Sequence, residues 1–116
     1  MAVKRIVANI AAEHTEEARR FYRDLFGLDI LMDLGWITIF GADQQMSVQL
    51  SVMTEGGSGT PVPAISIEVD DVDAVHADLV RSGLTAEYGP VDEPWGVRRF
   101  FVRDPLGTLV NVLMHL

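Results

Sequence analysis

The order of predicted secondary structure repeats once along the chain, and this repeat constrains the fold more than any other feature. Each half reads as a strand, a helix and then three strands. The two predicted helices end at glycines that are both followed by leucine, at Gly27-Leu28 and Gly83-Leu84. Because 116 residues are the size of one domain, we expect the two repeats to share a single fold.

Apolar periodicity places the elements of each repeat. The first helix follows an N-cap at Thr15, and the second follows Asp70 or Asp71. The first helix presents one apolar face, made of Ala18, Phe21, Tyr22, Leu25 and Phe26. The second presents Val72, Val75, Leu79 and Val80. The strands are predicted at residues 3–10, 28–32, 36–40, 46–53, 64–69, 84–91, 97–102 and 108–114.

A glycine-rich segment separates the two repeats. Residues 54–63 include Gly56, Gly57 and Gly59 before two prolines, which is typical of a flexible linker with a stiffer end. The predicted organisation is one domain over residues 1–116. It consists of a first module at 1–53, the linker at 54–63 and a second module at 64–116.

The last two strands are predicted to form a hairpin closed by Asp104-Pro105-Leu106-Gly107, which has the residues of a type I turn. If Asp104 pairs with Gly107, Phe100 lies opposite Asn111, and Arg98 shares their face. A bulge would shift this register by one residue and reverse the faces. Ahead of the hairpin, Pro94-Trp95-Gly96 places a large aromatic ring on a rigid bend.

The Pro-Trp-Gly bend, the arginine and phenylalanine after it, and the Asp-Pro-x-Gly turn resemble the end of a vicinal-oxygen-chelate domain. That superfamily includes glyoxalase I, extradiol dioxygenases, fosfomycin-resistance enzymes and bleomycin-resistance proteins, and the bleomycin-resistance branch is the most similar. Through the repeat, the resemblance covers the whole chain. It implies an α+β fold in which two βαβββ modules form a curved mixed sheet. The concave face of that sheet, here called the cup, would hold a ligand.

The resemblance also implies positions at which metal-dependent members place a histidine or a carboxylate. In this chain those positions hold Val7, Gln49, Ala64 and Asn111. Two apolar side chains and two neutral amides do not bind a divalent metal, so we expect neither a metal nor another cofactor. The three histidines are not expected at these positions: His14 opens a helix, His76 lies within the second helix, and His115 is near the terminus.

Strand alternation predicts which side chains face the cup. In residues 64–69, Ser66 and Glu68 should face it while Ile65, Ile67 and Val69 meet the helices. Ile37 and Ile39 should likewise meet a helix and leave their neighbours to the cup. The predicted ligand-binding residues are Val7, Trp36, Thr38, Phe40, Gln49, Ser51, Glu68, Trp95, Arg98, Phe100 and Asn111. The aromatic members either bind a ligand or fill the cup as core, and both interpretations stay open.

Charge and composition narrow the class of function. The net charge of −8 opposes a nucleic-acid partner and permits a cationic ligand. The absence of cysteine rules out disulfides and thiolate metal sites, and no apolar run is long enough to cross a membrane. We therefore expect a cytoplasmic protein. Related two-module chains commonly dimerise, so we also expect a homodimer whose modules pair within one chain or by exchange.

Three hypotheses for function remain open. The first is a metal-free protein that sequesters a small aromatic or cationic molecule, as bleomycin-resistance proteins do. The second is a metal-dependent lyase or dioxygenase of the glyoxalase type, which the fold alone supports. The third is a metal-free enzyme in which Glu68 acts as the general base, because burial in the cup would favour its protonated form.

Overall fold

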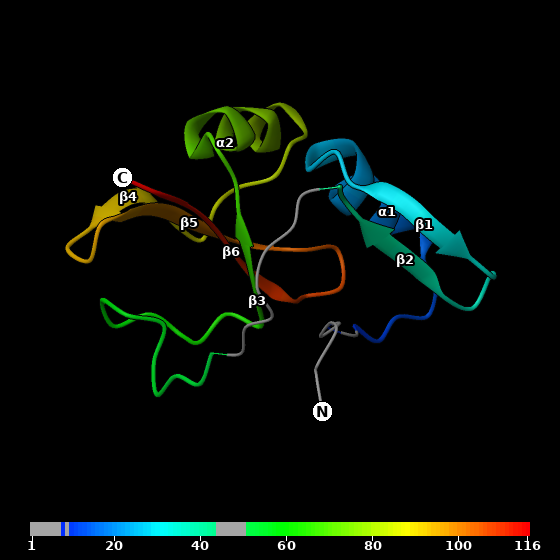
Figure 1. Cartoon of the computed structure of the whole chain (residues 1–116), viewed down its shortest axis with the longest axis horizontal. Coiled ribbons are helices and arrows are strands. Elements are labelled where there is room, and N and C mark those ends of the chain that lie inside the picture. The colour runs from blue at the N-terminus through cyan, green and yellow to red at the C-terminus, as the bar shows by residue number, and fades with distance from the viewer. Residues whose placement is uncertain (1–7, 9, 44–50) are drawn as a thin grey trace.

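The computed structural model describes residues 8, 10–43 and 51–116. Residues 3–7 and 9 of the predicted first strand and residues 46–50 of the fourth lie outside these ranges, and residues 8, 10 and 51–53 are not in a strand. The described chain contains a two-stranded sheet and a four-stranded sheet (Figure 1). In order, the elements are α1 (Glu16–Arg19), η1 (Arg20–Leu25), β1 (Asp29–Asp33), β2 (Thr38–Gly41), β3 (Ile65–Glu68), α2 (Val72–Arg81), β4 (Tyr88–Glu93), β5 (Val97–Arg103) and β6 (Leu109–His115).

The first helix runs from α1 directly into η1, a π-helical segment. Thr15 occupies the N-cap position, although its side chain makes no cap hydrogen bond. The predicted apolar face is confirmed, with Ala18, Phe21 and Tyr22 buried. The helix ends at Gly27, which has φ +71°, and the N–H of the next residue bonds back to Tyr22 O at 3.2 Å.

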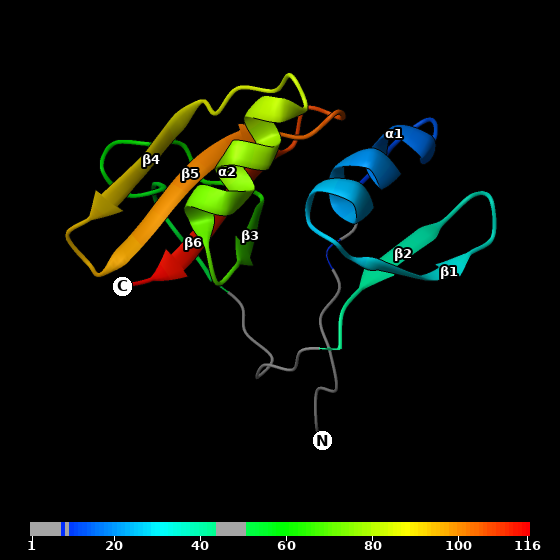
Figure 2. The ribbon, with the colours of Figure 1, turned by 90° about the horizontal axis from the view of Figure 1, so that it is seen from above.

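The second repeat forms a four-stranded sheet in the order β3-β6-β5-β4. Because β3 runs parallel to β6 while the other pairs are antiparallel, the sheet is mixed, as predicted. Helix α2 lies across one face of this sheet (Figure 2). Asp71 caps α2, accepting a hydrogen bond from Ala74 N at 3.0 Å.

Helix α2 packs through Val72, Val75 and Leu79, but Val80 is exposed, so its predicted place on the apolar face is wrong. Each residue of an α-helix turns about 100°, so Val80 lies about 80° around the helix from Val72, away from the buried face. The residue choice of the face is otherwise confirmed.

The core lies between the helices and one face of the four-stranded sheet. The sheet contributes Phe100, Val102, Val110 and Val112, all essentially without exposed surface. Tyr22 reaches from η1 to the β5–β6 turn, where its hydroxyl donates to Asp104 Oδ2 at 2.8 Å. This buried bond links the first repeat to the second.

The β5–β6 hairpin differs by one residue from its predicted register. Asp104 N donates to Thr108 O at 3.0 Å, so the turn contains three residues, the last of which is Gly107 with φ +82°. Phe101 therefore lies opposite Asn111, and Phe100 lies opposite Val112. The predicted pairing of Phe100 with Asn111 is wrong, because a glycine in the left-handed region allows the longer turn.

Strands β1 and β2 pair as an antiparallel hairpin separate from the four-stranded sheet. In both views its turn lies at the opposite end of the molecule from the β4–β5 turn (Figures 1 and 2). No helix among the described residues has the length and hydropathy needed to cross a membrane.

Candidate functional site

The sheet face that points away from α2 is hollowed near the β4–β5 turn. This hollow, here called the C-terminal hollow, has a volume of about 530 Å³. Its floor is formed by the β3-β6-β5 sheet and its wall by the β4–β5 turn and residues 53–57. It is lined by Ser51, Met53, Glu55, Gly56, Gly57, Ser66, Glu68, Trp95, Arg99, Asn111, Leu113 and His115.

The one-residue change of register decides which β5 side chains face this hollow. Arg99 faces it, while Phe100 packs in the core 5.4 Å from the ring of His76. Arg98 lies on the helix side and forms ion pairs with Asp73 and Asp92, both at 2.9 Å. The predicted placement of Arg98 and Phe100 in the cup is therefore corrected to Arg99 and Phe101, which share the face of Asn111.

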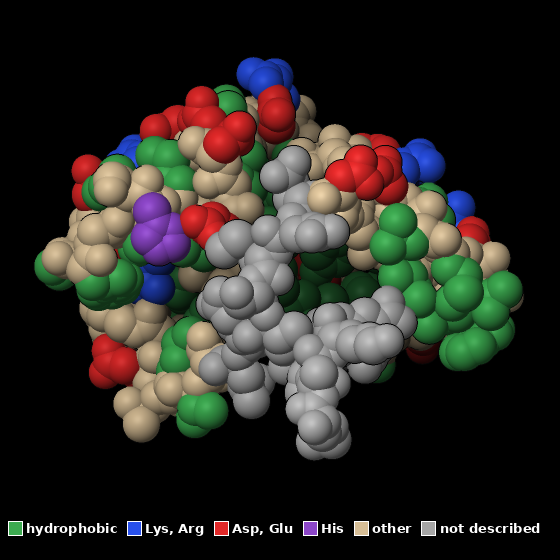
Figure 3. All heavy atoms as spheres, in the orientation of Figure 1, with side chains coloured by type: hydrophobic (Ala, Val, Ile, Leu, Met, Phe, Trp, Pro, Cys, Tyr) green, Lys and Arg blue, Asp and Glu red, His purple; other side chains and the backbone are tan. Residues whose placement is uncertain are grey.

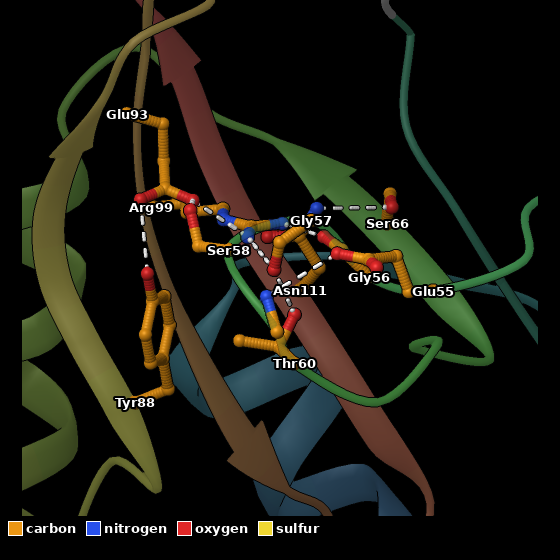
Figure 4. Close-up of polar contacts among 11 residues, drawn as sticks. Glu55, Gly56, Gly57, Ser58, Thr60, Ser66, Tyr88, Glu93, Arg99 and Asn111 are labelled. Carbon is orange, nitrogen blue, oxygen red and sulfur yellow. Dashed lines mark hydrogen bonds and ion pairs between the residues drawn. The ribbon is translucent and has the colours of Figure 1, made fainter.

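Arg99 is the most heavily engaged side chain of the site (Figure 4). Its guanidinium donates to Glu93 Oε2 at 2.7 Å, to Gly56 O at 2.7 Å and to Gly57 O at 3.3 Å. Both partners of the ion pair are buried, with side-chain exposures of 5% for Arg99 and 3% for Glu93. The guanidinium carbon also lies 4.9 Å from the centre of the Trp95 ring and 4.7 Å from that of Phe101.

Glu93 is held as a carboxylate by its neighbours. Tyr88 Oη donates to Glu93 Oε1 and Ser58 Oγ donates to Glu93 Oε2, each at 2.9 Å. Burial by itself would raise the pKa of Glu93, but these two hydrogen bonds and the charge of Arg99 outweigh it and hold the pKa below its ordinary range. A buried ion pair of this kind is costly to break, because removal of one partner leaves the other charge unpaired.

Part of the predicted linker is a structured loop. Gly56 N donates to Thr60 O at 2.8 Å, and Thr60 Oγ1 donates to Gly57 O at 2.7 Å. A Cβ on Gly57 would lie 2.7 Å from Cη2 of Trp95, and Gly57 has φ +86°. Only glycine therefore permits this loop to approach the indole so closely.

Several predicted residues lie together in the C-terminal hollow. They are Ser51, Glu68, Trp95 and Asn111. Trp95 is 52% exposed, and Asn111 is buried and donates from Nδ2 to Ser66 Oγ at 3.1 Å. Glu68 sits at the rim, half-exposed, with its Oε1 2.7 Å from His115 Nδ1. The predicted inward side of β3 is confirmed, since Ile67 and Val69 pack against the core.

The other predicted aromatic residues lie elsewhere. Trp36, Thr38 and Phe40 line a second, mainly apolar hollow of about 500 Å³ beside η1, which shares no lining residue with the first. Phe40 packs on Tyr22 with ring centres 5.7 Å apart, so its predicted cup-facing position is wrong. The loop after Phe40 gave no register signal, and the aromatic contact with the helix decided the face. Val7 and Gln49 lie outside the described residues.

Comparison with known proteins identifies the fold family. The sequence profile of the Glyoxalase/Bleomycin resistance protein/Dioxygenase superfamily matches residues 4–112. The chain belongs to this superfamily. No curated protein sequence matches the chain.

Solved structures of the superfamily fold resemble the chain over nearly its whole length. TnmS3, an antibiotic binding protein from Streptomyces sp. CB03234, has a TM-score of 0.69 at 22% identity, with 100% of this chain and 97% of TnmS3 covered. Lactoylglutathione lyase from Agrobacterium tumefaciens has a TM-score of 0.68 at 24% identity, with 97% and 92% covered. TioX from Micromonospora sp. ML1 has a TM-score of 0.64 at 20% identity, with 96% and 95% covered. At these identities, the similarity shows the α+β fold alone.

The residues at the superfamily's metal positions fit a metal poorly in this chain. Ala64 has no ligand atom, and Asn111 donates from Nδ2 to Ser66 while its Oδ1 is buried without a hydrogen-bond partner among the described residues. Within residues 8, 10–43 and 51–116, no three histidine, cysteine, aspartate or glutamate side chains come together as a metal-binding group. At the described positions, the amide oxygen of Asn111 is therefore the one atom that could serve as a ligand.

Other parts of the site were not predicted from the sequence: Arg99, Glu93, Tyr88 and the 56–58 loop. One signal was available: Gly107 before Thr108 is also typical of a three-residue turn with a glycine in the left-handed region, which moves Arg99 to the cup face. The contact between the loop and Trp95 had no signal, because residues about forty positions apart meet only through the tertiary fold.

Proposed function

We propose that the chain binds a small aromatic or cationic molecule in the C-terminal hollow without a metal, as a drug-sequestering protein would. The observation that carries this proposal is a half-exposed indole held rigidly beside a hollow with a buried amide on its floor. Trp95 offers an aromatic surface for stacking, and Asn111 offers an amide that can fix orientation. Met53, Trp95 and Leu113 supply the apolar surface of the hollow, and its other lining residues are polar or glycine.

The charges of the hollow support a cation over an anion. The charge of Arg99 is balanced by Glu93, so the guanidinium adds little net positive potential. Glu55 and Glu68 line the same hollow at exposed positions, in a chain with net charge −8. TnmS3 is described as antibiotic binding, and its fold matches this chain, which supports the same class of function here.

A fluorescence titration tests the proposal. The chain has two tryptophans, so a Trp36→Phe variant leaves Trp95 as the one indole reporter. A thermal-shift screen of aromatic amines and cationic drugs selects ligands, because binding to the folded state raises its stability. We expect saturable change in Trp95 emission with such ligands. Stabilisation by ligands that leave this emission unchanged would contradict the assignment of the site.

A second candidate function is metal-free proton transfer, favoured by the contact between Glu68 and His115 at the rim. A carboxylate that accepts from one imidazole nitrogen leaves the other nitrogen free to act as a base. Turnover of a bound ligand that is lost in Glu68→Gln, with binding retained, would favour this function over sequestration. The superfamily's metal-dependent chemistry has no comparable support in the described residues.

We also propose that the chain forms a homodimer. Exposed apolar side chains gather over the β1–β2 hairpin (Figure 3), among them Leu31, Leu34 and Trp36. Patches of this kind on soluble proteins often mark contacts with other chains. Light scattering at micromolar concentration should give the mass of a dimer, and a monomer mass would rule the dimer out. The cytoplasmic location stays a prediction.

A further inference from the structure

We infer that Arg99 is a positioning residue of the C-terminal hollow. It holds Trp95 and the loop at residues 56–58 in the arrangement that a ligand meets, without meeting the ligand through its own charge. This inference rests on the proposed function, because it assigns roles within the same site. It concerns a group of side chains that the resemblance to the superfamily does not assign.

The hydrogen bonds of Arg99 join three separate parts of the chain. One terminal nitrogen donates to Gly56 O at 2.7 Å, and the other donates to Glu93 Oε2 at 2.7 Å and Gly57 O at 3.3 Å. Glu93 in turn accepts from Ser58, which belongs to the same loop. The end of β4, the middle of β5 and the loop are thus held by one buried network (Figure 4).

The same guanidinium supports the indole. Its carbon lies 4.9 Å from the centre of the Trp95 ring, which places a cation against an aromatic face. Gly57 contacts another part of that ring, since a Cβ built there would lie 2.7 Å from Cη2. The ring therefore has neighbours in both Arg99 and the loop, and movement of either would move the stacking surface.

Holding Trp95 and the loop in position requires an arginine at residue 99 and not simply a positive charge. A planar guanidinium can bond a carboxylate and two carbonyls while one of its faces stacks on an aromatic ring. A lysine ammonium could replace the charge opposite Glu93, but it cannot reproduce the fork of hydrogen bonds or the stacking. Arg99→Lys thus separates the charge of residue 99 from its geometry.

Two glycines of the loop provide a matched pair of variants. Gly57 has φ +86° and Gly59 has φ +74°, so alanine pays a similar backbone cost at either position. A Cβ at Gly57 would collide with Trp95, whereas a Cβ at Gly59 meets nothing within 4 Å. Gly57→Ala should therefore displace the indole, and Gly59→Ala should leave it in place.

The test uses the full chain in the Trp36→Phe background, with benzyltrimethylammonium as the ligand probe and acrylamide as the probe of indole access. Gly57→Ala and Arg99→Lys should each weaken the affinity for benzyltrimethylammonium by about tenfold or more and increase acrylamide quenching of Trp95. The controls Gly59→Ala and Arg98→Lys should keep affinity within about twofold of the parent, because neither changes a group that contacts the ring. Circular dichroism establishes that each variant is folded at the temperature of measurement.

Two outcomes overturn the inference. If folded Gly57→Ala and Arg99→Lys keep the parent affinity and quenching, Arg99 and the loop do not position the indole. If Gly59→Ala weakens binding as much as Gly57→Ala, the loss reflects loop strain rather than Trp95. Absence of benzyltrimethylammonium binding by the parent counts against the proposed function instead, and the quenching comparison then still decides whether Arg99 and Gly57 hold the ring.

Discussion

The two hairpin turns that carry the tryptophans hold equivalent places in the two repeats, yet they are built differently. Each turn begins with an acidic residue that pairs with an arginine. In the β4–β5 turn, Glu93 pairs with Arg99 and both side chains are buried. In the β1–β2 turn, Asp33 pairs with Arg19 and about a third of each side chain is exposed, at 34% and 33%.

The difference extends to the indoles. Trp36 is 79% exposed beside exposed Leu34, whereas Trp95 is 52% exposed and rests on Arg99 and Gly57. Repetition of a hairpin therefore does not repeat its packing. The buried ion pair fixes the β4–β5 turn against the C-terminal hollow. The ion pair of the β1–β2 turn is partly exposed to solvent, and the apolar side chains of that hairpin remain exposed.

The largest expected effect comes from loss of one acidic partner. Glu93→Gln should lower the free energy of unfolding by about 3–5 kcal/mol, because it leaves the Arg99 charge buried without its counter-ion. Asp33→Asn is the matched change in the other turn and should alter the melting temperature only slightly, since water solvates Arg19. Urea unfolding followed by circular dichroism measures both. Equal losses would show that burial of the pair does not distinguish the turns.

The second expected effect concerns ligand affinity. Trp95→Ala should weaken binding of an aromatic cation by about 1–3 kcal/mol, because the indole is proposed as the stacking surface. Trp36→Ala should leave affinity unchanged, since Trp36 lines the other hollow. Isothermal titration calorimetry with benzyltrimethylammonium compares them. If Trp36→Ala has the larger effect, the ligand site belongs beside η1.

The comparison of the turns also shows what the sequence could predict. The order of the elements within residues 16–41 and 65–115, both glycine caps and the inward side of β3 follow from local patterns that the structure keeps. Within β5, however, each face carries one arginine and one phenylalanine, Arg98 with Phe100 on one and Arg99 with Phe101 on the other, so either pair could face the cup. One residue of turn length decided between them, and no periodicity within the strand carries that information.

The third expected effect tests how the two repeats are joined. Tyr22 donates to Asp104 between the repeats, and Tyr88 donates to Glu93 within the second, at 2.8 and 2.9 Å. Burial, and then the neighbouring Asp104, raises the pKa of Tyr22, so it stays a neutral donor. Tyr22→Phe should cost about 1.5 kcal/mol, and Tyr88→Phe about the same, because each removes one bond to a carboxylate.

Their unfolding transitions should still differ. Tyr22→Phe weakens the contact between the repeats, so it should broaden the urea transition and lower its m-value, whereas Tyr88→Phe should shift the midpoint alone. Intrinsic fluorescence in Trp36→Phe and Trp95→Phe backgrounds follows each repeat separately. If every variant gives coincident and equally steep transitions, the repeats unfold as one unit, and loss of the Tyr22–Asp104 bond does not uncouple them.

The smallest expected effect is a difference in acid sensitivity that survives salt. The pKa of Glu93 lies below its ordinary value of 4.5, so its stabilisation is complete above that pH and is lost as pH falls through the folded-state pKa. The pKa of Asp33 is also lowered, first by the Gly35 N–H and then, against a desolvation penalty, by Arg19. The pH range over which Asp33 loses its stabilisation, however, starts near 3.8.

Salt should separate the two ion pairs further. In about 1 M NaCl the Debye length is about 3 Å, which screens the exposed Arg19 charge far more than the buried Arg99 charge. Unfolding free energies between pH 6 and about pH 3 should therefore fall from about pH 4.5 downward in both low and high salt, and Glu93→Gln should remove that early fall in both. Asp33→Asn should alter only the part below about pH 3.8, and less so in high salt. If the fall in unfolding free energy near pH 4.5 disappears in high salt, the Glu93–Arg99 pair is solvated. The packing of Trp95 would then be the one remaining difference between the two turns.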